Sequence, residues 1–160
     1  MEEKVVAELE RLGIRYLSRL TKSSTLKDYP PAQFVADIIQ QPSARVRNAA
    51  ISLFLAKPEY TVYVPDALRR TNNEESISLK FFYLAAVFLQ QKYRVNPITP
   101  LPDLFSTEFG LVGTNPDERL RSLAEKHQQV SGKSINWQGT YKNAAKHLLH
   151  QWELEKAWNK

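Results

Sequence analysis

Apolar residues recur along most of this chain at steps of three and four, which places them on one side of an α-helix. The first such stretch covers residues 2–21 and predicts a helix that Gly13 weakens. Pro30 and Pro31 open a second predicted helix, because proline lacks only a donor that the first helical turn leaves unpaired. Residues 44–56 predict a third helix.

The third helix has clear signals at both ends. Ser43 is a favourable N-cap residue, and Pro58 cannot continue a helix. Residues 59–64 are β-branched and aromatic and are compatible with a strand, although Pro65 argues against a long one. Residues 66–70 then predict a short helix.

The most hydrophobic stretch, at about residues 75–94, is apolar on nearly every side. Asn72 and Asn73 form a turn signal before it, and Glu74 and Glu75 favour a helix start because carboxylates are stabilised near a helix N-terminus. A helix that is hydrophobic all round is normally enclosed by other helices. We therefore predict that this is the central helix of the fold.

The remainder of the chain contains an irregular segment and two more helices. Residues 95–115 hold three prolines and two glycines but also many apolar side chains, and we interpret them as an irregular segment attached to the core. Helices are predicted at about residues 116–129, ended by Gly132, and at about residues 140–158. The inward side of the last helix is predicted to hold Tyr141, Ala145, Leu148 and Trp152.

These elements predict an all-α fold, a single-domain bundle of six or seven helices over residues 1–160. Within it, the pattern R-x-R-x-A-A runs from Arg45 to Ala50. With that pattern, residues 43–70 resemble a helical hairpin of the HEAT-repeat type. No second copy follows at a fixed period, and a solenoid needs about three stacked repeats, so the resemblance implies a local packing style only.

Composition narrows the chemistry further. The 160 residues include no cysteine, which excludes a disulfide framework, a thiolate zinc site, an iron–sulfur cluster and a cysteine nucleophile. The net charge of +5 permits contact with nucleic acid or with an acidic partner. No phosphate-binding loop, dinucleotide motif or zinc-protease motif is present, and we expect no cofactor and no metal. Without a signal peptide or an apolar run of about 20 residues, we expect a cytoplasmic protein that does not enter a membrane.

Arg121 and His127 form a candidate catalytic pair. Their spacing is similar to the R-x(4–6)-H motif of HEPN-type ribonucleases, which are small, all-helical and metal-independent. The resemblance implies that the histidine and the arginine act at the scissile phosphate of RNA, in a site usually composed across a dimer. Such a pair makes chemical sense, because imidazole can move a proton near neutral pH while guanidinium stabilises the charged phosphate.

A second alternative is a nucleic-acid surface on the predicted first helix. Five basic residues there fall within an arc of about 80°, which can follow a phosphate backbone, and Tyr16 adds a stacking surface. The same bases also suit the helix dipole as a solvated face, and Glu8 can pair with one of them. The five are Lys4, Arg11, Arg15, Arg19 and Lys22.

The final predicted helix offers a candidate protein-binding surface. Its row of His147, Gln151, Leu154 and Trp158 places a leucine and a tryptophan on the outer side, and exposed tryptophan is enriched where proteins meet. His150 lies three residues after His147, a metal-ligand spacing that we interpret as an exposed pair without metal.

The main hypothesis is therefore a non-enzymatic, cytoplasmic helical protein that binds a macromolecular partner, with a protein as the expected partner. One concrete form is the antitoxin-like member of a bacterial toxin–antitoxin or defence module. A HEPN-like ribonuclease and a nucleic-acid-binding protein are the alternatives, and association with further copies of the chain stays open.

Overall fold

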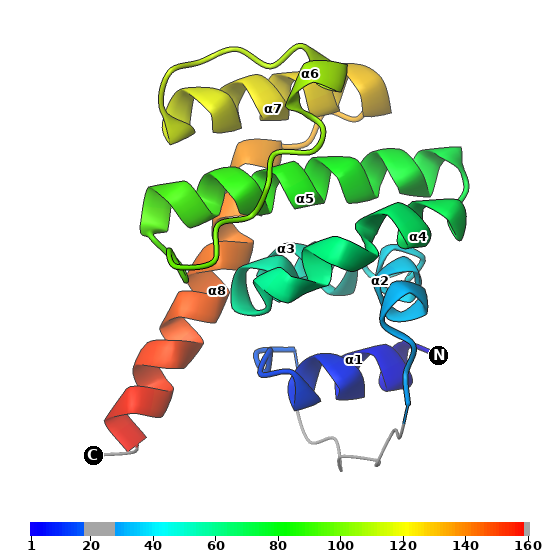
Figure 1. Cartoon of the computed structure of the whole chain (residues 1–160), viewed down its shortest axis with the longest axis vertical. Helices are drawn as coiled ribbons and strands as arrows, with labels where there is room; N and C mark the ends of the chain where they lie inside the picture. The colour runs from blue at the N-terminus through cyan, green and yellow to red at the C-terminus, as the bar shows by residue number, and fades with distance from the viewer. Residues whose placement is uncertain (18–27, 159–160) are drawn as a thin grey trace.

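The stretch that is apolar on every side forms α5 (Asn73–Tyr93), which lies at the centre of the molecule as predicted (Figure 1). All residues from 81 to 90 are buried, so nearly three turns of α5 face protein in every direction. The helices packed against it are α3 (Ala44–Ala56), α7 (Pro116–Ser131) and α8 (Trp137–Trp158). The prediction of an enclosed central helix is confirmed.

The computed structural model describes residues 1–17 and 28–158, and all the regular secondary structure in these ranges is helical. The described residues contain eight α-helices, seven of them longer than one turn, which confirms the all-α, single-domain bundle. The other elements are α1 (Glu2–Arg11), α2 (Pro31–Ile39), the 3-10 helix η1 (Pro58–Tyr63), α4 (Val64–Arg69) and the four-residue α6 (Ser106–Phe109). Among the described residues, no helix has both the length and the apolar character that crossing a membrane requires.

The helices form layers on the two sides of α5 (Figure 1). α7 covers one side, while α3, α2 and α4 lie on the other, and α1 packs at the outer end against α2. α8 contacts α3, α5 and α7 with its first half, and its C-terminal end projects away from the bundle. The buried residues of α8 stop at Leu148, so the last ten residues of this helix lie at the surface or are only partly covered.

Hydrogen bonds fix the start of α5 where the sequence predicted it. The Oδ1 of Asn72 accepts from the backbone N–H of Glu75 at 2.9 Å, and the Oε1 of Glu75 accepts from the backbone N–H of Asn72 at 2.9 Å. This reciprocal capping box satisfies two backbone donors that the first turn of the helix leaves unpaired.

The irregular segment after α5 is attached to the core by polar as well as apolar contacts. Leu101 and Phe109 are buried, as predicted for an attached segment. The side chain of Gln90, itself buried on α5, donates to the carbonyl of Thr99 at 2.9 Å and accepts from the backbone N–H of Leu101 at 2.7 Å. Gln90 therefore supplies the hydrogen bonds that an irregular backbone lacks when it lies on a helix.

The predicted first helix is wrong in its length. α1 ends at Arg11 instead of about Thr21, because Gly13 adopts a left-handed conformation with φ of +97° and turns the chain away from the helix. Ile14 then enters the core, where it is almost fully buried. The last part of the predicted helix lies outside the described residues.

The region predicted as a possible strand is also helical. Residues 59–64 belong to η1 and the start of α4, because Pro58 and Pro65 both occupy helix-starting positions in this short stretch. The two arms of the predicted hairpin at residues 43–70 are therefore α3, capped by Ser43 as expected, and a second arm that is split into η1 and α4. α7 and α8 match their predictions, with α8 beginning three residues earlier, at Trp137.

The capping box predicts a measurable effect on stability. Asn72→Ala removes one side-chain acceptor from the start of α5 and is expected to lower the free energy of unfolding by about 1 kcal/mol. Asn73→Ala, at the exposed next position, is the matched control and is expected to change it little. Urea unfolding followed by circular dichroism measures both, and equal losses in the two variants would contradict this account of the α5 start.

Candidate functional site

His127, one member of the candidate catalytic pair, lies in the hydrophobic core with 2% of its surface exposed. Its ring stacks on Phe81, with centroids 4.2 Å apart, and on Trp137, with centroids 3.6 Å apart. Its Nδ1 forms a hydrogen bond of 2.5 Å with the hydroxyl of Tyr141. These contacts connect α7 to α5 and α8, so the histidine serves as a core residue.

The environment of His127 keeps its ring neutral. Burial lowers the pKa of His127 to about 3, and the nearby positive charge of Lys133 acts in the same direction. An imidazole with this pKa is not protonated near neutral pH, and a buried ring has no access to an RNA phosphate. The spacing of Leu120, Leu123 and His127 on one face of α7 is the sequence signal that could have predicted this burial.

Arg121, the other member of the pair, is exposed on α7. Six residues along a helix correspond to about 600°, so Arg121 points roughly 120° away from His127. The structure therefore separates the two residues that the resemblance to HEPN-type ribonucleases singled out, one at the surface and one in the core.

The basic residues predicted for a nucleic-acid surface do not share one helix face. Arg11 donates two hydrogen bonds, of 2.6 and 2.8 Å, to the buried carboxylate of Glu8. Arg15 lies beyond the end of α1 and pairs with Glu155 at 3.3 Å. Lys4 is exposed on α1, whereas Arg19 and Lys22 lie outside the described residues. The predicted arc of five basic residues required one continuous helix over residues 2–21, whereas α1 ends at Arg11.

The predicted protein-binding residues line a groove of about 550 Å³, here called the α8 groove. One wall is the C-terminal half of α8, and the other is the segment that follows α1. Leu154 is 50% exposed and Trp158 is 86% exposed. His147 also lines the groove, where its ring stacks on Tyr16 with centroids 5.1 Å apart.

Gln151 has a different role from its neighbours in the α8 groove. Its Oε1 accepts from the backbone N–H of Arg15 at 2.8 Å, and its Nε2 donates to the carbonyl of Gly13 at 2.7 Å. The same Nε2 donates to Glu155 at 2.6 Å. The amide is thus fully used in joining α8 to the segment after α1, and Gln151 forms the connection between the two walls of the groove.

His150 also lines the α8 groove. Over residues 1–17 and 28–158, the side chains of His, Asp and Glu form no group of three or more that could hold a metal ion. The α8 groove therefore combines the apolar side chains of Leu154 and Trp158 with the charged side chains of Arg15 and Glu155.

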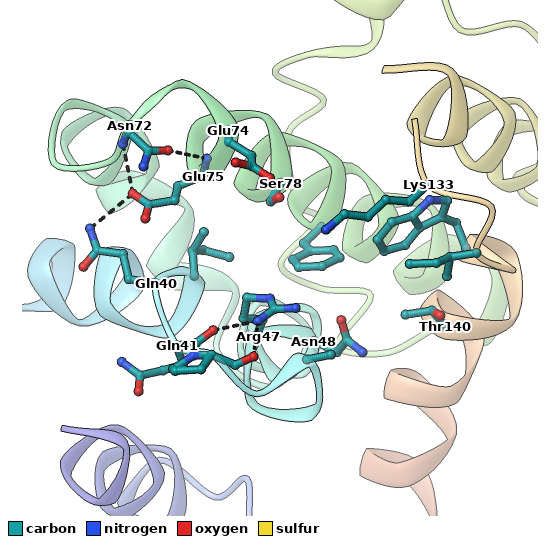
Figure 2. A pocket seen from close by; sticks show the side chains of 16 residues that line it. Gln40, Gln41, Arg47, Asn48, Asn72, Glu74, Glu75, Ser78, Lys133 and Thr140 are labelled. Carbon is teal, nitrogen blue, oxygen red and sulfur yellow. Dashed lines mark hydrogen bonds between the residues drawn. The ribbon is translucent and has the colours of Figure 1, made fainter. Parts of the chain in front are cut away.

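A second concave site was not predicted from the sequence. It is a pocket of about 400 Å³, here called the polar pocket, lined by the end of α2, the starts of α3 and α5, and the connection between α7 and α8 (Figure 2). Arg47 and Asn48 of α3, Glu74 and Ser78 of α5, and Lys133 of the connection are among its residues. Because these come from segments distant in sequence, no local motif marks the pocket.

Comparison with known proteins gives no match to a family model, a curated protein or a solved structure.

The burial of His127 predicts a specific pH dependence of stability. The unfolded chain, in which histidine has a pKa near 6.5, binds a proton before the folded chain does. Stability from His127 is therefore complete above about pH 6.5 and is lost as the pH falls toward 3. Between pH 7 and pH 5 we expect a loss of about 2 kcal/mol.

Urea unfolding at the two pH values measures this loss. His127→Phe keeps a stacking ring but cannot be protonated, so its stability is expected to fall less between pH 7 and pH 5. Parallel pH dependence in the wild type and the variant would show that His127 is accessible to protons in the folded protein.

Proposed function

We propose that this chain acts as a binding protein rather than an enzyme, and that the α8 groove receives an apolar segment of a protein partner. The observation that supports this most strongly is the exposure of Leu154 and Trp158 side by side on a helix end that projects from the bundle. Large apolar side chains grouped at a concave surface are typical of protein interfaces.

The apolar side chains of this surface contribute favourably to the free energy of binding when a partner covers them. Burying one large apolar side chain contributes about 1.5–3 kcal/mol, and tryptophan is among the residues that most often dominate an interface. Leu154 and Trp158 lie one turn apart and can be covered by the same partner segment. They supply the apolar centre of the proposed contact.

The rest of the α8 groove supports the same proposal. The charged pair Arg15 and Glu155 lies at its edge, which matches the usual arrangement of a polar rim around an apolar centre. The stacked rings of Tyr16 and His147 and the hydrogen bonds of Gln151 hold the walls together in the free protein. A groove that is already formed loses little conformational entropy on binding.

The chemistry of the groove indicates what the partner presents. An apolar ridge with flanking polar residues, as on an amphipathic helix, fits an apolar centre with charged edges. An antitoxin that covers the helix of a toxin would be one such protein.

The proposal predicts that charges in the groove abolish binding. Leu154→Asp with Trp158→Asp is expected to leave the fold intact, because both side chains are exposed, and to reduce partner capture from the native cell by about tenfold or more. The measurement is affinity capture of the tagged protein with quantitative mass spectrometry. Sedimentation of the same samples identifies a second copy of the chain as the partner.

Val112→Asp is the matched control, because Val112 is 71% exposed and belongs to the segment between α6 and α7. Figure 1 shows these two helices on the opposite side of the bundle from the end of α8. It is expected to retain whatever the wild type captures. Identical capture by the wild type, the control and the double variant, with identical sedimentation, would remove the α8 groove as the binding surface.

A further inference from the structure

The polar pocket is a second site, independent of the α8 groove. The pocket lies at the N-terminal end of α8, next to Trp137 and Thr140, whereas the groove lies along its C-terminal half. Their nearest lining residues on α8, Thr140 and His147, lie about 10 Å apart along the helix axis, and the two sites share no lining residue.

Two cations reach the polar pocket from different elements. Figure 2 shows Arg47 on α3 below the pocket and the Lys133 side chain extending across it from the connection between α7 and α8. The Nη1 of Arg47 donates to the carbonyls of Gln41 and Pro42 at 2.7 and 2.6 Å, which holds the guanidinium in place. Its position is therefore set before any ligand arrives.

Neither cation forms a salt bridge within the described part of the chain. Over residues 1–17 and 28–158, no carboxylate lies within salt-bridge distance of Arg47 or Lys133. The positive charge of Lys133 also acts on His127, whose pKa it helps to lower. An anion in the pocket would compensate both positive charges.

An aromatic side chain at the start of α8 also lines the polar pocket. Trp137 lines the polar pocket, and its Nε1 is buried without any hydrogen-bond partner in the described part of the chain. The Trp137 side chain is only partly buried, so part of its ring surface is open to a ligand.

The acidic residues of the pocket limit the size of the negative charge it accepts. Glu75 is occupied by the capping box and by a hydrogen bond of 3.4 Å from the side chain of Gln40. Glu74 lies on the exposed side of the pocket and is available to a donor group of a ligand. The arrangement favours a ligand with one anionic group and a larger uncharged body.

We infer that the polar pocket binds a small organic anion, whose carboxylate or phosphate lies between Arg47 and Lys133 and whose flat apolar body lies against Trp137. The charge of the anion is compensated by two side chains that are free of carboxylate partners. The apolar body covers the part of the Trp137 ring that the fold leaves exposed. Inorganic anions, which lack such a body, bind more weakly.

The indole N–H signals of the three tryptophans in a ¹H–¹⁵N NMR spectrum test this inference directly. Benzoate and adenosine monophosphate serve as the carboxylate and phosphate probes, and inorganic phosphate serves as the anion without an apolar body. At least one organic probe is expected to shift the Trp137 indole signal at concentrations up to about 10 mM, and inorganic phosphate to shift it less. The stronger organic probe identifies the preferred anionic group.

Three variants locate the binding. Trp137→Phe keeps an aromatic ring and assigns the Trp137 signal by its loss. Lys133→Ala, at an exposed position, is expected to weaken binding of the organic probe by about tenfold. Lys156→Ala removes an exposed lysine near the other end of α8 and is expected to leave it unchanged.

Three results would overturn the inference. One is a Trp137 indole signal that neither organic probe moves. Another is unchanged affinity of the organic probe in Lys133→Ala, which would place the binding elsewhere. The third is an inorganic phosphate affinity equal to that of the better organic probe, which would show that the aromatic surface takes no part.

Discussion

The structure depends on the burial of residues 81–90 of α5, a helical stretch with no exposed side. A helix with ten consecutive buried residues must have neighbours on all sides, because each exposed large apolar side chain forfeits about 1.5–3 kcal/mol. α3, α7 and α8 provide these neighbours, and even the irregular segment after α5 is attached to it through Gln90. The positions of α3, α7 and α8 follow from this requirement.

The packing around α5 also determines which polar side chains are accessible to a ligand or partner. His127 completes an aromatic cluster with Phe81, Trp137 and Tyr141, which leaves it neutral and closed to solvent. The helix that covers α5 with its first half, α8, is longer than the surface it covers. Its two ends therefore border the two concave sites, the polar pocket at its start and the α8 groove along its end.

α3, α5 and α7 were predictable because the spacing of apolar residues and the capping residues at the helix ends indicated the same boundaries. Both signals act over a few residues and can be read from a short stretch of sequence. The end of α1 was missed because a glycine inside an apolar pattern is compatible with both continuation and termination, and the core contact of Ile14 decides between them. The sequence singled out four residues that line the α8 groove, His147, Gln151, Leu154 and Trp158. It did not reveal that Gln151 joins α8 to the segment after α1. The polar pocket depends on tertiary contacts between distant segments, which no single stretch of sequence reveals.

Hydrogen exchange of the native protein in low concentrations of urea tests the central claim most directly, because it reports the free energy of opening along every helix. The account predicts that residues 81–90 of α5 exchange only through global unfolding, together with residues 141–148 of α8. It predicts much smaller opening free energies for residues 153–158. Exchange of α5 through local opening, while the surrounding helices stay protected, would contradict the claim that its enclosure organises the fold.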